Sequence, residues 1–96
     1  MQKQKIISSI SAEKAYLKEH FGVEEIALFG SFARGEEKAE SDIDLFVSLE
    51  KPSYSQLMGL YIYLEKILNS KVDIVRKGPH ISNRFLEQIG KDLIYV

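Results

Sequence analysis

The segment from Leu28 to Val47 (LFGSFARGEEKAESDIDLFV) places the strongest constraint on what this chain can fold into. An apolar run turns at Gly30-Ser31, and a polar stretch then leads into an apolar strand that carries Asp42 and Asp44. Side chains alternate between the two faces of a strand, so these two carboxylates share a face, with their Cα atoms roughly 6.6 Å apart. Like charges at this spacing repel unless a cation lies between them. The segment therefore indicates a site for a metal ion and a phosphate.

Composition limits the class of protein. The 96 residues are 45% hydrophobic and 28% charged, which is typical of one globular domain, so we expect residues 1–96 to form a single domain. A net charge of −1 predicts no direct binding to nucleic acid. The sequence has no cysteine, which excludes a disulfide framework and a thiolate site. Its apolar runs are too short to span a membrane and its N-terminus lacks the features of a signal peptide, so we expect a cytoplasmic protein with no membrane partner.

Hydrophobic periodicity predicts three main helices and one short one. The main helices are expected over residues 3–20, 53–69 and 81–89, the first ended by Gly22 and the last by Gly90 as C-caps. The spacing of Ser53 and Gln56 is typical of a capping box at a helix start. A helical turn or two is expected over residues 32–36, with Ser31 as its N-cap.

Short apolar runs predict strands between these helices, over residues 25–29, 42–49 and 71–76. The tail, residues 93–96 (LIYV), is expected to add an edge strand or to pack on the core. In the second strand Ile43, Leu45, Val47 and Leu49 share one face, and the two aspartates share the other. This order of elements predicts an α/β (α+β) fold with a small mixed sheet flanked by helices.

A third acidic residue, Asp73, lies within the apolar run Val-Asp-Ile-Val. If the third strand lies beside the second, Asp73 can join Asp42 and Asp44, either as a metal ligand or as the base that takes a proton from an attacking hydroxyl. Magnesium suits such carboxylates, because it is held by one or two of them together with water and substrate phosphates. Two Mg²⁺ ions are expected, and carboxylates alone do not distinguish Mg²⁺ from Mn²⁺.

The Gly30-Ser31 turn supplies candidate phosphate ligands. A glycine before a helix lets the backbone approach a ligand closely, and free N–H groups at a helix start attract phosphate oxygens. Ser31 adds a hydroxyl, and Arg34 can reach the phosphates or the developing charge. The alternatives are a plain turn with a capping serine, and a surface arginine paired with Glu36 or Glu37.

Three motifs together, GSFARG from Gly30, DIDL from Asp42 and VDIV around Asp73, resemble the nucleotidyltransferase superfamily that includes DNA polymerase β. Within it, the short chain is similar to the minimal nucleotidyltransferase (MNT) proteins, and the resemblance covers nearly the whole sequence. All signature positions are filled. The resemblance implies the palm fold of polymerase β-like nucleotidyltransferases.

The resemblance also implies roles for these residues. Gly30 and Ser31 would bind the triphosphate of ATP, Asp42 and Asp44 would coordinate magnesium, and Asp73 would complete the metal-binding triad and activate the acceptor hydroxyl. Proteins of this kind are antitoxins of HEPN–MNT toxin–antitoxin modules. They transfer AMP from ATP to a tyrosine of the helical HEPN toxin, which implies such a partner here.

The leading interpretation is thus a magnesium-dependent nucleotidyltransferase that adenylylates a partner protein. One alternative is a non-catalytic binding module that neutralises its partner by covering it. Another is a nucleotidyltransferase for small molecules, which the chain disfavours because only residues 74–96 follow Asp73, too few for a helical domain that shapes an acceptor pocket. Oligomeric state and base specificity are left open.

Overall fold

The structure, a computed structural model, describes residues 2–96. Its elements in chain order are α1 (Lys3–Ala12), α2 (Lys14–Phe21), β1 (Val23–Phe29), α3 (Gly30–Arg34), β2 (Ile43–Leu49), α4 (Tyr54–Leu68), β3 (Val72–Arg76), α5 (Asn83–Gly90) and β4 (Ile94–Tyr95). None of the helices in this part of the chain is long and apolar enough to cross a membrane.

The strands form one mixed sheet in the order β3-β2-β1-β4. Strand β1 is antiparallel to both β2 and β4, whereas β2 and β3 are parallel. The expected mixed sheet is therefore confirmed, and the tail adds an edge strand, as one of the two expectations had it. The parallel pair needs a crossover connection, which α4 provides.

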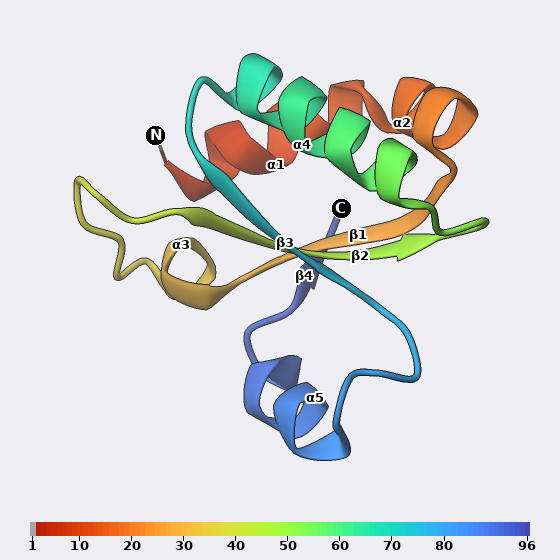
Figure 1. The fold of residues 1–96 in the computed structure, drawn as a ribbon. Coiled ribbons are helices and arrows are strands. Elements are labelled where there is room, and N and C mark those ends of the chain that lie inside the picture. The colour runs from red at the N-terminus through yellow and green to blue at the C-terminus, as the bar shows by residue number, and fades with distance from the viewer. Residues whose placement is uncertain (1) are drawn as a thin grey trace.

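Helices cover both faces of the sheet (Figure 1). Helices α1, α2 and α4 lie over one face, α5 lies under the other, and α3 extends from the end of β1. The alternation predicted for β2 is confirmed, because Ile43, Leu45, Val47 and Leu49 are all buried in the core beneath the helical layer. Phe46 points to the other face, where Ala27, Phe29 and Ile89 form a second, smaller cluster.

The helix expected over residues 3–20 is wrong in one respect, because it is broken at Glu13. Glu13 leaves the helical conformation (φ −107°, ψ 5°), and its carboxylate accepts a hydrogen bond from the Tyr63 hydroxyl of α4. The apolar spacing continues through the break, so periodicity alone could not detect it. The C-cap at Gly22 is confirmed, with the left-handed conformation that the position requires (φ 67°).

The last helix also differs from its prediction. Helix α5 begins at Asn83 because the Ser82 side chain accepts a hydrogen bond from the Phe85 N–H (3.1 Å) and so sets the start. Gly90 is the last helical residue, and the C-cap is Lys91 in a right-handed conformation. The N–H groups of Asp92 and Leu93 both bond to the Ile89 carbonyl, so this end needs no left-handed glycine.

The predicted start of α4 is confirmed and can be tested. The Ser53 side chain accepts a hydrogen bond from the Gln56 N–H (3.2 Å). A Ser53→Ala variant should lose about 1 kcal/mol of unfolding free energy in urea, because an N–H group in the first turn loses its partner. Ser55→Ala, in the same turn and also exposed, is the control and should change stability by less than about 0.5 kcal/mol. Equal effects of the two changes would contradict the capping role.

Candidate active site

Asp44 lies at the centre of the site, on the inner strand β2. It is paired in register with Phe29 of β1 on one side and with Asp73 of β3 on the other. Residues paired in register on adjacent strands project from the same face. Asp44 and Asp73 are therefore neighbours on the face that carries α5, which confirms that the third strand lies beside the second. Asp44 is half-buried, whereas Asp73 is exposed.

Asp42 is exposed and lies immediately before β2, so the expectation that the strand begins at residue 42 is wrong by one residue. Pairing with β3 begins at Ile43, whose N–H donates to the Lys71 carbonyl (3.0 Å). On the other side, β1 has already turned into α3. Asp42 thus has no strand on either side, although its charge still acts on Asp44.

The electrostatics of Asp44 indicate an uncompensated negative site. Burial raises the pKa of its carboxyl above the usual value, and the charges of Asp73 and Asp42 raise it further. Arg34 opposes this shift only weakly, since its influence is the smallest of the four. Two other carboxylates therefore act on Asp44, and the one opposing charge, Arg34, has less influence than either of them.

Gly30 connects β1 to α3 directly against the Asp44 side chain. Its φ of +76° lies in the left-handed region that favours glycine. A Cβ atom at this position would lie 2.1 Å from Asp44 Oδ2 and 2.9 Å from Asp44 Cγ. Only glycine lets the backbone and the carboxylate approach this closely, so a ligand held by Asp44 would also meet the Gly30 backbone.

Ser31 is inside α3, and its predicted role as the N-cap is wrong. The cap position is Phe29, in extended conformation, and no side chain caps the start of this helix in the described chain. The positive φ of Gly30 turns the chain at once from strand to helix, which places Ser31 in the first turn. Its carbonyl accepts a hydrogen bond from the Glu36 N–H (2.8 Å), closing the far end of the helix beyond Gly35.

Arg34 is held by two carboxylates. Its Nε donates to Glu36 and its Nη1 donates to Asp92, both at 2.9 Å. The ion pair with Glu36 is the alternative to a phosphate contact that the sequence left open. The second partner, Asp92, is 58 residues away in the sequence. A contact between Arg34 and a phosphate would have to replace at least one of these ion pairs. Sequence reasoning missed Asp92, which no local motif marks.

The carboxylates fit a magnesium ion that is completed by substrate. No three His, Asp or Glu side chains within residues 2–96 are placed so that they could hold a metal ion by themselves. Magnesium does not need such a cage, because it uses one or two carboxylates and takes its other oxygens from water and phosphates. An all-oxygen donor set with unbalanced negative charge at Asp44 meets this requirement.

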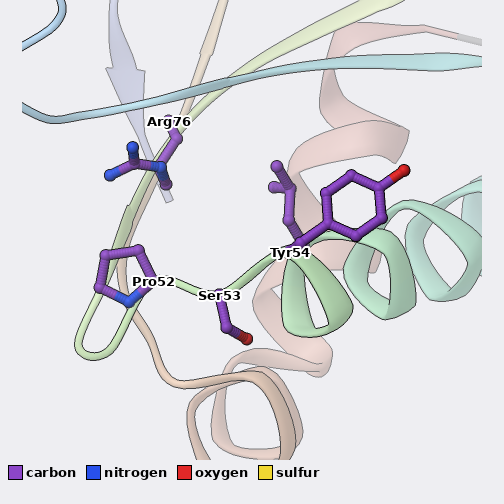
Figure 2. A pocket seen from close by; sticks show the side chains of 5 residues that line it. Pro52, Ser53, Tyr54 and Arg76 are labelled. Atoms are coloured by element: carbon purple, nitrogen blue, oxygen red, sulfur yellow. The ribbon is translucent and has the colours of Figure 1, made fainter.

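Two surface hollows differ in their relation to these residues. One, of about 320 Å³, lies beside Asp42 and is lined by Ala39, Glu40, Ser41, Asp42, Ser70 and Lys71. The other, of about 270 Å³, lies at the far end of β3, between Arg76 and the residues around the start of α4 (Figure 2). Only the first is adjacent to a predicted site residue. Its lining by Ser70 and Lys71 was not foreseen, because nothing in the sequence connects the start of β3 with Asp42.

Comparison with known proteins assigns the family. Residues 13–96 match the family described as polymerase beta, nucleotidyltransferase. The chain belongs to this nucleotidyltransferase family. The expected family and fold class are thereby confirmed.

Two curated relatives support the assignment along nearly the full length. A Methanocaldococcus jannaschii protein, named provisionally as a protein adenylyltransferase, is 48% identical over 87 residues, which cover 86% of each chain. The protein adenylyltransferase MntA of Thermococcus cleftensis is 38% identical over 94 residues, covering 97% of this chain and 94% of the relative.

Solved structures share the nucleotidyltransferase fold. One described provisionally as a minimal nucleotidyltransferase has a TM-score of 0.82 and 30% identity, covering 98% of this chain and 95% of the other. Another comes from a tri-AMPylated Shewanella oneidensis HEPN toxin in complex with an MNT antitoxin. It has a TM-score of 0.64 and 21% identity, and covers 98% of this chain and 71% of the other.

The close approach at Gly30 in this nucleotidyltransferase can be tested against a matched glycine. Gly35 has nearly the same φ (+72°), but a Cβ there would meet nothing within 4 Å. Gly35→Ala should therefore cost about 1 kcal/mol from left-handed strain alone. Gly30→Ala should cost roughly 1–3 kcal/mol more in urea unfolding, because the new methyl group displaces the Asp44 side chain. Equal losses would show that the Asp44 contact is unimportant.

The repulsion at Asp44 predicts a pH dependence of stability. A raised pKa means that the folded protein binds this proton more tightly than the unfolded chain, so stability falls as pH rises through that pKa. At pH 7 an Asp44→Asn variant should be more stable than the native protein by on the order of 0.5 kcal/mol, since solvent screens this partly exposed group. The difference should disappear below the ordinary Asp value of 3.8.

This difference is measured by urea unfolding from pH 3 to pH 8 without divalent ions. Glu25→Gln, an exposed acidic residue at the other end of β1, controls for the loss of one negative charge. A variant less stable than the native protein at pH 7 would contradict the assignment of Asp44 as a repelled carboxylate.

Proposed function

We propose that this protein transfers AMP from ATP to a tyrosine hydroxyl of a HEPN toxin, with magnesium, and thereby acts as its antitoxin. The observation that carries the proposal is the in-register placement of Asp44 beside Asp73, with the Gly30 backbone against the Asp44 carboxylate. The adenylyltransferase names of the relatives support AMP as the transferred group. The AMPylated HEPN toxin bound to an MNT antitoxin supports the class of acceptor.

Asp42 and Asp44 would hold the magnesium ion, and Asp73 would contribute to a second one. When bound, magnesium would neutralise phosphate charge and make the α-phosphorus more susceptible to attack. Manganese satisfies the same oxygen ligands and is expected to substitute for it in an assay.

The turn at Gly30 and the first turn of α3 would hold the triphosphate. The absence of a side chain at Gly30 leaves its backbone open to the ligand, and the uncapped N–H groups at the start of α3 provide donors. Ser31 adds its hydroxyl to these donors. Arg34 would join them by exchanging Glu36 or Asp92 for a phosphate oxygen.

The chemical step forms one bond and breaks one. The tyrosine oxygen of the acceptor attacks the α-phosphorus of ATP, the bond from the α-phosphorus to the bridging oxygen breaks, and pyrophosphate leaves in line. Asp73 accepts the proton of the tyrosine hydroxyl, a role for which its exposure and its place beside Asp44 are suited. The donors around Gly30 and Ser31 stabilise the charge that develops on pyrophosphate.

The experiment is an incubation of the purified protein with a HEPN partner, labelled ATP and Mg²⁺, with the mass of both chains followed. One or more AMP groups should appear on a partner tyrosine, and Asp42→Asn or Asp44→Asn should reduce the rate at least 10³-fold, because charge stabilisation in the transition state is lost. Glu25→Gln, which removes a carboxylate from the other end of the sheet, should keep the native rate.

Transfer by the Asp42→Asn, Asp44→Asn double variant at the native rate would refute the catalytic assignment. If the native protein forms a stable complex with the toxin but transfers none of the four nucleotides, it acts as a binding module. The same holds if the double variant neutralises the toxin as well as the native protein does.

A further inference from the structure

Strand β3, which carries Asp73, is an edge strand. It pairs with β2 on one side only. The Lys71 carbonyl accepts from Ile43 and the Lys77 N–H donates to the Val47 carbonyl, so the odd-numbered residues of this strand turn their backbone groups toward β2. By alternation, Val72 and Ile74 turn theirs toward the free edge. Unpaired groups at such an edge leave a strand weakly held and open to other chains.

Two side chains of α4 form hydrogen bonds with the backbone at this edge. The Tyr61 hydroxyl accepts a hydrogen bond from the Ile74 N–H (3.0 Å) and donates one to the carbonyl of the same residue (3.2 Å). Glu65 Oε2 accepts from the Val72 N–H (3.0 Å). Residues 61 and 65 are one helical turn apart, so both lie on the face of α4 that meets β3. They replace part of the hydrogen bonding that a further strand would provide.

These hydrogen bonds hold the residues on both sides of Asp73. We infer that Tyr61 and Glu65 are positioning residues that keep Asp73 in register with Asp44 for the transfer reaction. Neither acts on the Asp73 side chain directly, because Val72 and Ile74 are buried under the helical layer while Asp73 projects from the opposite face. The inference rests on the proposed function, in which Asp73 accepts the proton of the acceptor hydroxyl.

The position of Asp73 is held mainly by the pairing of β3, whereas the position of Asp44 has further support. Asp44 lies on an inner strand, paired on both sides, and its side chain packs against the Gly30 backbone. Asp73 is exposed on a strand of five residues with one neighbour. A displacement of about 1 Å at a reacting group can cost on the order of 10²-fold in rate. Freeing the edge of β3 should therefore affect proton transfer before it affects nucleotide binding.

The test compares two hydroxyl deletions on one helix. Tyr61→Phe removes the bonds to Ile74 and keeps the ring. Tyr63→Phe removes a hydroxyl that donates to Glu13 instead, and that bond raises the pKa of Tyr63 to about 12. At a temperature where both variants are folded, Tyr61→Phe should lower kcat roughly 10- to 100-fold with the KM for ATP within about twofold. Tyr63→Phe should keep the native kcat, even if its Tm falls by as much as the Tm of Tyr61→Phe.

Glu65 provides a conservative rescue. Glu65→Gln keeps an oxygen that can accept from Val72, whereas Glu65→Leu leaves that N–H without a partner. We expect Glu65→Gln to retain the native kcat. Glu65→Leu should lower kcat by about the same factor as Tyr61→Phe does. If the Gln variant loses as much as the Leu variant, the charge of Glu65 and not its hydrogen bond is what matters, and the inference fails for this residue.

Amide hydrogen exchange tests, without an activity assay, whether Tyr61 keeps β3 paired with β2. The Asp73 N–H faces β2 and touches neither α4 side chain, so its exchange reports whether the pairing with β2 loosens. Tyr61→Phe should speed exchange at both Ile74 and Asp73 by about 10-fold or more, and Tyr63→Phe should leave Asp73 unchanged. Faster exchange at Ile74 alone would mean that Tyr61 only shields the edge, and would overturn the inference.

The two readouts also separate this inference from the proposed function. In one outcome, the native protein transfers no nucleotide while Tyr61→Phe still speeds exchange of the Asp73 amide. The proposed reaction is then refuted, and the stabilisation of β3 by Tyr61 is confirmed. If transfer is efficient but Tyr61→Phe and Tyr63→Phe have equal kcat values, the reaction is confirmed and the positioning role is refuted.

Discussion

The parallel pairing of β2 with β3 is the interaction on which the rest of the site depends. It places Asp44 and Asp73 side by side on one face, although 29 positions separate them in the sequence. A parallel pair requires a long crossover, and α4 both makes this connection and packs over the opposite face of the sheet. The same helix then supplies Tyr61 and Glu65 to the free edge of β3. One helix thus connects the two strands, covers them and fixes their outer edge.

Strand β2 divides stability and chemistry between its two faces. Its residues Ile43, Leu45 and Val47 are fully buried beneath the helical layer and account for a large part of the core. On the other face Asp44 lies next to Phe46, whose contacts with α5 close the second cluster. Because the alternation is strict, the strand can carry an unfavourable carboxylate without disturbing the core. The unfavourable free energy of the Asp44 carboxylate is therefore confined to one end of β2, on the face that carries α5.

The sequence predicted those features that depend on local pattern. The place of Asp44 on an apolar strand, the turn at Gly30 and the apolar surroundings of Asp73 are all local, and the structure places these three residues together. The strand itself begins at Ile43, so Asp42 lies just before it. The features that were missed depend on contacts between distant segments. The break at Glu13 meets Tyr63 across 50 residues, and Arg34 meets Asp92 across 58. Ser31 was wrongly expected to be a cap, because only the backbone shows that the helix begins two residues earlier, with Phe29 at the cap position.

The strain at Asp44 and the proposed affinity for a cation have the same physical origin. Burial and the charges of Asp73 and Asp42 disfavour the ionised carboxylate, and they do so only while nothing positive lies among them. A ligand that binds the folded state alone returns that free energy as stability. Arg34 is the one cation in the described chain that acts on Asp44, and its two ion pairs direct it toward Glu36 and Asp92 instead. The negative charge around Asp44 is therefore only weakly offset within the described chain, which favours the binding of the magnesium ion proposed for this site.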